Sequence, residues 1–488
     1  MRKHISIAVI IALAAVDWHT PATASELTLT PCRIDAGNAI PTAKALCGEF
    51  EVAEDPARPD GKTIVLSVAM VPALSVAPEP DPIVFLAGGP GQSAIESYLG
   101  VRGAFAKAQQ DRPILLVDQR GTGASNKLSC DSILDEEDMT ESMDLTQVKG
   151  MIKECLEVLP GDPRFYTTSV AVQDLDAVRV ALGIEQLNLW GGSYGTRVAL
   201  HYLRRYPEHT RSVIIDGVVP ADMYLGPAIA LDAQTSVEHA FSRCAEIDSC
   251  HEQFGDLGQK LRELKASLAR SPQTVTMPHP RTAVPTTETV NDETLAGVIR
   301  LSAYSPFTRA LLPTMIDRAH AGDMTMLAAQ SIQINDNFTG LLATGMHNAV
   351  MCSEDTPFYG DVSIEQLNDT FMGSLHYEYL VESCRHWPVG IVDDDFSTPV
   401  VSDKPVLILS GEFDPVTPPA YGDQALKTLS NARHLVVAEQ GHIVSGVGCM
   451  PTLLDNFIET LDADALEAEC LERAGGLPFF IDAIGPTP

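Results

Sequence analysis

Short runs of almost uninterrupted apolar residues recur along this chain, and most of them are followed by a segment with helical periodicity. We expect strands at residues 63–71, 83–87, 114–117, 187–190, 213–216, 406–410 and 434–437. All but the first are nearly continuous in apolar residues, which suits strands buried on both faces of a parallel sheet. Helix-like segments lie between them, as at 168–182 and 194–206. The alternation predicts an α/β fold with a mostly parallel sheet.

This alternation stops between about residue 220 and residue 398. The intervening segment has helix-like stretches at 230–247, 256–269, 292–303 and 307–321, and a Pro/Thr-rich piece at 271–287 that reads as an extended excursion or loop. We interpret residues 221–397 as an inserted, mainly helical cap. Residues 25–220 and 398–488 are then the two parts of the α/β core.

The N-terminus has the features of a secretory signal. Arg2, Lys3 and His4 precede an apolar run at 5–16, and small residues follow at 22–24. A basic start, a short apolar run and an Ala-x-Ala site are typical of a cleaved signal peptide. We therefore expect residues 1–24 to be removed and the protein to be exported, to a periplasm or the medium. An uncleaved N-terminal anchor is the alternative, although no segment reaches the ~18 apolar residues of a membrane span.

The ten cysteines agree with export. An even number in an exported chain predicts disulfides. Because each successive pair brackets a loop-sized or hairpin-sized segment, we expect the cysteines to pair as neighbours in sequence. Zinc ligation is the rival interpretation, but the chain contains no C-x-x-C and no H-E-x-x-H. We expect no metal and no cofactor.

The chain is strongly acidic, with 33 lysines and arginines against 65 aspartates and glutamates and a formal net charge of −32. Such a charge argues against nucleic acid as a partner, because phosphates are bound by Lys and Arg. It is compatible with cationic substrates such as peptide amino termini. The simpler explanation is an acidic surface that only confers solubility, and the charge alone does not decide between the two.

One serine sits at a tight corner between a predicted strand and a predicted helix, in the sequence Gly191-Gly192-Ser193-Tyr194-Gly195. The bare G-x-S-x-G pattern is weak, but between a strand and a helix it is typical of a nucleophile elbow. The small residues let strand and helix approach closely, and the first N–H groups of the helix point towards developing negative charge. We predict Ser193 as a nucleophile.

A base and an orienting acid follow in the required chain order. Asp414 comes just after the predicted strand 406–410, and His442 lies in the loop after the strand 434–437. The order Ser, Asp, His is the one found with nucleophile elbows of this kind. In this interpretation His442 takes and returns the proton of Ser193, while Asp414 fixes the imidazole tautomer. An Asp-Pro turn and a Gly-His loop would be the plain explanations of each residue alone.

The loop after strand 83–87 is rich in glycine, and glycine allows backbone to approach a substrate closely. We predict an oxyanion hole formed by the N–H groups of Gly89 and Tyr194, with Gly88 as the alternative to Gly89. A phosphate-binding loop does not fit, because neither G-x-G-x-x-G nor G-K-[ST] is present. A simple tight turn remains the alternative.

Together these motifs resemble the prolyl aminopeptidase-like α/β-hydrolases, and within them the larger, exported tripeptidyl aminopeptidase-like group. The resemblance rests on GGPGQS at 88–93, DQRGTGAS at 118–125, GGSYGT at 191–196, GEFDPVTPP at 411–419 and GH at 441–442. It implies a serine exopeptidase that releases amino-terminal proline or short peptides under a helical cap. Two residues depart from the prolyl aminopeptidase pattern: Ala87 stands where histidine is usual, and Tyr194 where tryptophan is usual.

The resemblance also implies that carboxylates near the cap bind the substrate's amino terminus. The stretch 351–357 is the best match here, and we choose Glu354, since a carboxylate can pair with an ammonium group. A surface acidic pair would be the alternative. We expect Asp118 and Arg120 of the DQRG stretch to support the site by hydrogen bonds.

The leading expectation is therefore an exported serine aminopeptidase acting on peptides. A carboxylesterase or lipase-type hydrolase is the main alternative, because the same three residues cleave esters. A catalytically silent binding protein that keeps the fold belongs to a different class. The presence of a residue of the right type at each of Ser193, Asp414 and His442 argues against it.

Overall fold

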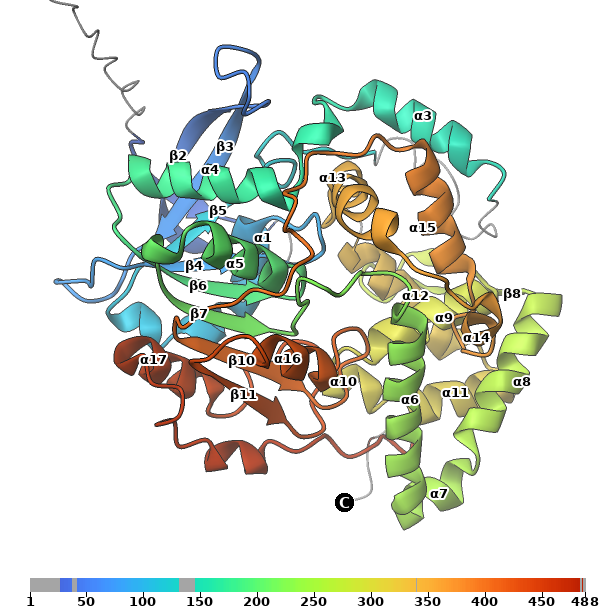
Figure 1. The fold of residues 1–488 in the computed structure, drawn as a ribbon. Coiled ribbons are helices and arrows are strands. Elements are labelled where there is room, and N and C mark those ends of the chain that lie inside the picture. Colours follow the sequence, from blue (N-terminus) through green and yellow to red (C-terminus); the bar gives the residue numbers. More distant parts are fainter. Residues whose placement is uncertain (1–26, 37–41, 131–144, 339, 483–484, 486–488) are drawn as a thin grey trace, which may run out of the picture.

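The structure is a computed structural model of the 488-residue chain, and it describes residues 27–36, 42–130, 145–338, 340–482 and 485. The predicted signal peptide, residues 1–24, lies outside the described residues. Figure 1 shows a twisted central sheet with helices packed against it, and a second, mainly helical region beside it.

The central sheet has nine strands in the order β1-β2-β3-β5-β4-β6-β7-β10-β11. Strands β1, β2 and β3 run antiparallel to their neighbours, and from β5 to β11 all pairings are parallel. The prediction of a mostly parallel α/β sheet is thus confirmed. The strands are β1 (Thr30–Ile34), β2 (Ala43–Ala53), β3 (Thr63–Val71), β4 (Ile83–Leu86), β5 (Ile114–Val117), β6 (Leu187–Gly192), β7 (Thr210–Asp216), β10 (Val406–Gly411) and β11 (Ala432–Val437).

Helices cover both faces of this sheet, which is why its central strands are apolar throughout. On one face Ile408 of β10 belongs to the core shared with α4 and α5, and on the other face Leu407 and Leu409 belong to the core shared with α1 and α17. Alternate residues of one strand point to opposite faces, so both need apolar side chains. The helices beside the sheet are α1 (Ala94–Val101), α4 (Thr168–Ala181), α5 (Tyr194–Arg205), α16 (Pro419–Leu426) and α17 (Met450–Thr460). Helix α3 (Val148–Val158) packs instead against the insertion helix α15 (Leu375–His386).

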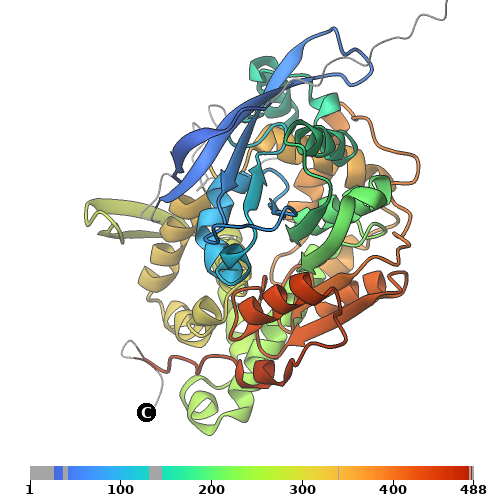
Figure 2. The same ribbon diagram turned by 90° about the vertical axis from the view of Figure 1, so that its left-hand side faces the viewer.

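The chain between β7 and β10 forms a helical insertion with an apolar core of its own (Figure 1). Its helices are α6 (Ile229–Glu246), α7 (Asp248–Phe254), α8 (Leu257–Arg270), α9 (Asp292–Ser302), α10 (Pro306–Arg309), α11 (Leu312–His320), α12 (Thr325–Phe338), α13 (Thr344–Val350), α14 (Ile364–Asn368) and α15 (Leu375–His386). Strands β8 (Gln273–Pro278) and β9 (Pro285–Val290) form a hairpin that projects from the insertion (Figure 2). The predicted loop at 271–287 is thus mostly an exposed hairpin.

All ten cysteines are paired, and each pairs with its neighbour in the sequence of cysteines, as predicted. Disulfides persist in oxidising compartments, so this cysteine usage fits an exported protein. In the part of the chain that the structure describes, we find no helix with the length and apolar character that a membrane crossing needs. The pairs are Cys32–Cys47, Cys130–Cys155, Cys244–Cys250, Cys352–Cys384 and Cys449–Cys470.

Candidate active site

Ser193 occupies a strained corner between β6 and α5. Its φ of 55° and ψ of −126° lie in a region that residues with a Cβ rarely adopt. The adjoining strand and helix meet so closely that a Cβ on Gly195 would lie 2.1 Å from the Leu86 carbonyl oxygen. A Cβ on Gly191 would lie 2.2 Å from the Gly195 carbonyl oxygen. Glycine at both positions is therefore required for this corner, as the sequence pattern indicates.

Asp414 and His442 come together at the carboxyl ends of β10 and β11. His442 Nδ1 lies 2.7 Å from Asp414 Oδ2. The aspartate side chain is fully buried, and its other oxygen accepts the N–H groups of Val416 and Thr417, each at 2.9 Å. Since Asp414 holds the Nδ1–H, the other ring nitrogen, Nε2, is left to act as a base.

The charges of Asp414 and His442 shift the pKa of each group in opposite directions. Burial raises the pKa of Asp414, but the neighbouring His442 and the backbone donors outweigh it, so the net pKa is lowered. Burial lowers the pKa of His442, but the charge and hydrogen bond of Asp414 outweigh it, so the net pKa is raised. The carboxylate therefore stays ionised and stabilises the imidazolium that forms when His442 takes a proton.

The imidazole of His442 lies against the strand next to the serine corner. Ser193 N–H donates to the Asp216 carbonyl at 2.9 Å. At the following residue, a Cβ added to Gly217 would lie 2.8 Å from His442 Cε1. Ser193 and His442 both belong to the described residues, and no hydrogen bond joins Ser193 Oγ to the imidazole in this conformation. The catalytic roles of Ser193, Asp414 and His442 stay predictions.

Asp216, at the end of β7, holds the histidine loop in place. Its carboxylate accepts the N–H groups of Val444 and Ser445 at 2.9 and 2.7 Å, and the Ser445 hydroxyl at 2.6 Å. Trp190 Nε1 donates to the same hydroxyl at 2.9 Å. Burial raises the pKa of Asp216 to about 6 against these hydrogen bonds, which lower it. The loop carrying His442 is thus tied to the two strands that flank the serine corner.

The glycine-rich loop after β4 runs beside the nucleophile. A Cβ added to Gly88 would lie 3.1 Å from Ser193 Cβ. Gly89 has a φ of 107° and is joined to Pro90 by a cis peptide bond. Tyr194 is the first residue of α5, where a backbone N–H has no acceptor within the helix. Which N–H groups bind an oxyanion, Gly89 and Tyr194 or Gly88 and Tyr194, stays a prediction.

Glu354 lies in a π-helical turn, Met351–Asp355, and its side chain is fully buried. Thr168 donates to its carboxylate from the backbone N–H at 2.5 Å and from the hydroxyl at 2.8 Å. Burial raises the pKa of Glu354 to about 7, with the nearby Arg197 acting in the opposite direction. Thr168 binds one site on each oxygen, and because the side chain is fully buried, an ammonium group reaches Glu354 only if the surrounding side chains move. The amino-terminus role stays a prediction.

Glu354 is also connected to the residue after the nucleophile. The Tyr194 hydroxyl lies 2.6 Å from the Thr168 hydroxyl, which donates to Glu354. Arg197, on the next turn of α5, forms two hydrogen bonds with Asp355 at 2.8 and 2.9 Å. The turn at 351–355 therefore holds the first two turns of α5 in place through Glu354 and Asp355.

Asp118 and Arg120 make supporting hydrogen bonds of the kind predicted. Asp118 accepts the Ser93 hydroxyl at 2.7 Å, and Ser93 also caps α1. Arg120 pairs with Asp174 of α4 at 2.6 and 2.7 Å. Asp118 thus holds the loop at 88–93, whereas buried Arg120 joins the end of β2 to the chain before α4 through the carbonyl oxygens of Glu54 and Phe165.

Two contacts of the imidazole were not predicted. The Thr417 hydroxyl lies 2.8 Å from Asp414 Oδ2 and 3.1 Å from His442 Nδ1. The ring of Tyr304, in the helical insertion, forms an edge-to-face contact with the imidazole at 5.1 Å between centroids. The Tyr304 backbone carbonyl also accepts the backbone N–H of His442 at 2.8 Å. Thr417 could have been found from its place in the Asp-x-x-Thr turn. Tyr304 carries no comparable signal, because only the folding of the insertion brings it there.

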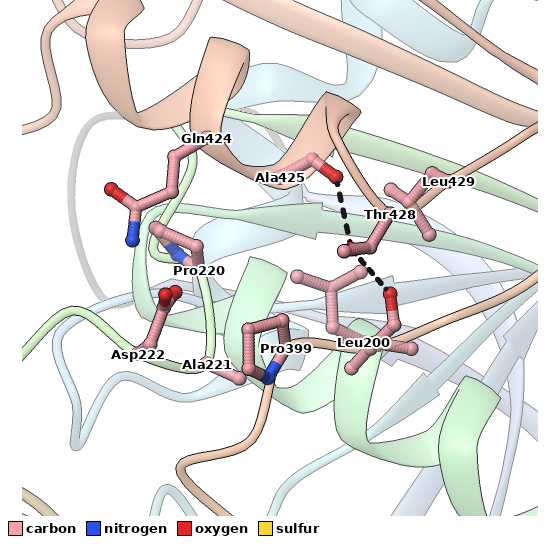
Figure 3. A pocket seen from close by; sticks show the side chains of 10 residues that line it. Leu200, Pro220, Ala221, Asp222, Pro399, Gln424, Ala425, Thr428 and Leu429 are labelled. Atoms are coloured by element: carbon pink, nitrogen blue, oxygen red, sulfur yellow. Dashed lines mark hydrogen bonds between the residues drawn. The ribbon is translucent and has the colours of Figure 1, made fainter.

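The pocket in Figure 3 is separate from these residues. It lies between α5, the segment after β7 and α16, and its walls are largely apolar (Figure 3). Neither Ser193 nor His442 belongs to its lining. The lining residues are Leu200, Pro220, Ala221, Asp222, Pro399, Val400, Gln424, Ala425, Thr428 and Leu429.

Two family models match the chain in the regions that build this site. Residues 81–248 match the α/β hydrolase fold, and residues 369–470 match a family described as TAP-like protein. The first region contains Ser193, and the second contains Asp414 and His442. This protein is an α/β-hydrolase. The TAP-like match places the C-terminal part of this hydrolase in the branch that its motifs resemble.

Relatives of the hydrolase include proteins named as peptidases. Serine protease Hip1 of Mycobacterium tuberculosis is 26% identical over 452 residues, covering 84% of this chain and 85% of the relative. Tripeptidyl aminopeptidase of Streptomyces coelicolor is 24% identical over 476 residues, covering 88% and 84%. Proline iminopeptidase of Neisseria gonorrhoeae is 29% identical over 141 residues, covering 29% and 34%. The first two similarities extend over both the sheet and the insertion.

Proposed function

We propose that this hydrolase is an exported serine exopeptidase that cleaves peptide bonds near the free amino terminus of peptides, as a proline iminopeptidase or a tripeptidyl aminopeptidase does. The 2.7 Å contact between His442 Nδ1 and Asp414 Oδ2, beside the strained corner of Ser193, carries this proposal. The names of the relatives that match along most of the chain support peptide bonds as the target.

In the proposed mechanism, Ser193 Oγ attacks the carbonyl carbon of the scissile bond and His442 Nε2 takes the hydroxyl proton. Two backbone N–H groups, those of Gly89 and Tyr194, stabilise the oxyanion. His442 then returns the proton to the leaving amine nitrogen, which leaves the amino-terminal portion as an ester on Ser193. Water, activated by the same imidazole, hydrolyses that ester. Asp414 orients the imidazole throughout and remains ionised.

The carboxylate for the substrate's amino terminus in this proposal is Glu354, and its use requires a movement that exposes this buried side chain to the ammonium group. Residues 221–397 act as a cap that limits how much of the substrate fits on the amino-terminal side of the serine. The five disulfides support export of the mature chain, and residues 1–24 are proposed as the signal that directs it.

Digestion of a mixed peptide library, with mass spectrometry of both fragments, tests the proposal. We expect trimming from the amino terminus in units of one to three residues, and no cleavage of the same peptides after acetylation. Internal cleavage, or trimming of acetylated peptides, would contradict an aminopeptidase.

A carboxylesterase or lipase-type hydrolase is the alternative, because the same catalytic residues cleave esters. It predicts rapid turnover of a simple 4-nitrophenyl ester and negligible turnover of peptide 4-nitroanilides with a free amine. A fluorophosphonate probe separates both from a silent binding protein, because only an activated serine reacts. Labelling should disappear in Ser193→Ala.

A further inference from the structure

Arg300, near the end of α9, is a cation without an ionic partner. Nη2 makes a long 3.2 Å hydrogen bond to the Tyr304 hydroxyl, and the guanidinium lies 5.8 Å from the centre of the same ring. Nε is buried and has no hydrogen-bond partner. Across the described ranges, no carboxylate lies within ion-pair distance of Arg300. In a chain where acidic residues outnumber basic ones 65 to 33, an uncompensated guanidinium requires an explanation.

This guanidinium lies next to the candidate active site. Tyr304 connects it to His442, since the same ring lies 5.8 Å from the guanidinium and 5.1 Å, between centroids, from the imidazole. The Arg300 charge also opposes protonation of His442, although the contacts with Asp414 outweigh it. A ligand group bound by Arg300 would thus sit one aromatic ring away from the base.

Two histidines from other helices of the insertion face the same charge. His347 of α13 lies 3.2 Å from the Pro90 carbonyl of the glycine-rich loop through its Nδ1. Desolvation, and then the charges of Arg300 and His347, lower the pKa of His376 of α15. The Arg300 charge thus reaches both histidines, and His347 connects this neighbourhood to the glycine-rich loop beside Ser193.

Two carboxylates whose charges act on these groups are engaged elsewhere. Asp355 acts on His347 electrostatically, but its two oxygens bind Arg197. Asp414 is bound by His442 and by the backbone after it. Neither forms an ion pair with Arg300. Arg300 is therefore a cation without a carboxylate partner among the described residues of an acidic protein, which otherwise repels anionic groups.

We infer that Arg300 binds a carboxylate of the peptide substrate, so that the hydrolase prefers peptides with a negative charge near the scissile bond. This inference rests on the proposed peptidase function and adds a substrate class to it. Nη1 has no hydrogen-bond partner and is not among the buried atoms, so it is open to an approaching group. A carboxylate can bind end-on to Nη1 and Nη2, the arrangement that guanidinium groups favour.

Support of the Tyr304 ring is the other role that Arg300 could have. That role accounts for the Nη2 contact and the ring contact, but it needs no positive charge. It leaves Nη1 open, whereas the buried Nε stays without a partner in either role. The two roles therefore differ in whether a charge on the substrate changes the effect of replacing Arg300.

The test measures kcat/KM for matched substrate pairs. Each peptide pair differs by Glu against Gln at one position on either side of the scissile bond, and a further pair differs by a free against an amidated carboxyl terminus. A pair of esters, the 4-nitrophenyl half-ester of adipic acid and 4-nitrophenyl hexanoate, asks the same question without a peptide bond. The variants are Arg300→Gln and Arg300→Lys, with Arg270→Gln at the exposed end of α8 as the control.

In the wild type we expect one or more carboxylate substrates to exceed their neutral partners by ~10- to 100-fold, the range for a hydrogen bond to a charged group. The ratio should fall to about twofold or less in Arg300→Gln, remain in part in Arg300→Lys, and be unchanged in Arg270→Gln. The Glu–Gln and acid–amide pairs distinguish a side-chain carboxylate from a terminal one. Because the readout is a ratio, a general loss of activity through Tyr304 does not imitate it.

Equal kcat/KM within every pair, or a preference that survives in Arg300→Gln, would overturn the inference. If peptides are cleaved without such a preference, the proposed function stands and the carboxylate site is wrong. If peptides are not cleaved but the ester pair shows a preference that depends on Arg300, the carboxylate site stands and the peptidase function is wrong.

Discussion

The edge of the sheet and the helical insertion contribute to the candidate site in opposite ways. At the sheet edge every carboxylate is satisfied: Asp414 and Asp216 each accept several hydrogen bonds inside the protein. In the insertion Arg300 is left with unpaired donor atoms and His376 is open to solvent. The comparison teaches that the carboxylates that position His442 and its loop make all their hydrogen bonds within the protein, whereas the group proposed to meet a substrate keeps unused hydrogen-bonding capacity.

The largest expected effect comes from the sheet edge itself. Asp414→Asn and His442→Ala should each lower kcat by ~10³- to 10⁴-fold, because the imidazole loses its orienting partner or the base is absent. Thermal unfolding should show that both variants remain folded. Turnover close to that of the wild type in either variant would show that the sheet edge does not carry the chemistry.

Asp216→Asn asks whether the position of the His442 loop depends on Asp216 as well as on Asp414. An amide cannot accept the three donors that the carboxylate accepts from Val444 and Ser445, so the histidine loop should loosen. We expect kcat to fall by ~10- to 100-fold and the free energy of unfolding by ~1–3 kcal/mol, measured by urea denaturation. Asp403→Asn, on an exposed segment, is the control. Unchanged kcat would mean that the loop is held without Asp216.

Glu354→Gln tests a residue that shares features of both regions. Its carboxylate is buried, like those of Asp414 and Asp216 at the sheet edge, but it is proposed to bind the substrate. We expect the preference for free over acetylated amino termini to fall by about tenfold, the effect of losing one charged contact. Glu365→Gln, on the exposed face of α14, should leave the preference intact. An equal loss of kcat on both kinds of substrate would instead assign Glu354 to the support of Tyr194.

The smallest expected effect is a shift in pH dependence. Because the net pKa of His442 is raised, the base is neutral only above a pH higher than 6.5, its usual value. kcat/KM should therefore fall as the pH decreases through that higher value. In Asp414→Asn the raising interaction is lost while burial still lowers the pKa, so the acid limb should move to lower pH in the residual activity. An acid limb that stays in place would contradict control by Asp414.

The parallel half of the sheet could be predicted because its strands are buried on both faces and consist of apolar runs. Strands β1 and β2 were missed, since they belong to the antiparallel edge and include exposed residues. The predicted helix at 307–321 is broken into α10 and α11, and Pro313 sits in the first turn of α11, where proline is tolerated. The exposed hairpin β8–β9 was predicted only as an extended excursion or loop, because proline stands at its strand ends and few of its residues are apolar.

Within the site, Ser193, Asp414 and His442 could be predicted because each follows a recognisable strand. Asp216 also ends a strand, but its role depends on which loop packs over it, and that is decided by tertiary contacts. Arg300 lies on α9 and Tyr304 in the turn that follows it, and helical periodicity predicts only which face of α9 is buried. Their position beside His442 results from the way the insertion packs on the sheet, which no local pattern records.

The pattern of cysteine pairing has a consequence for how the two parts of the molecule are held together. Cys244–Cys250 and Cys352–Cys384 lie within the helical insertion, and the other three bridges lie within the rest of the chain, so no bridge joins the two. Each part is stiffened separately, while the contact between them consists of packing, hydrogen bonds and ion pairs. An oxidising environment therefore stabilises each part of the hydrolase and leaves the interface between them without a covalent link.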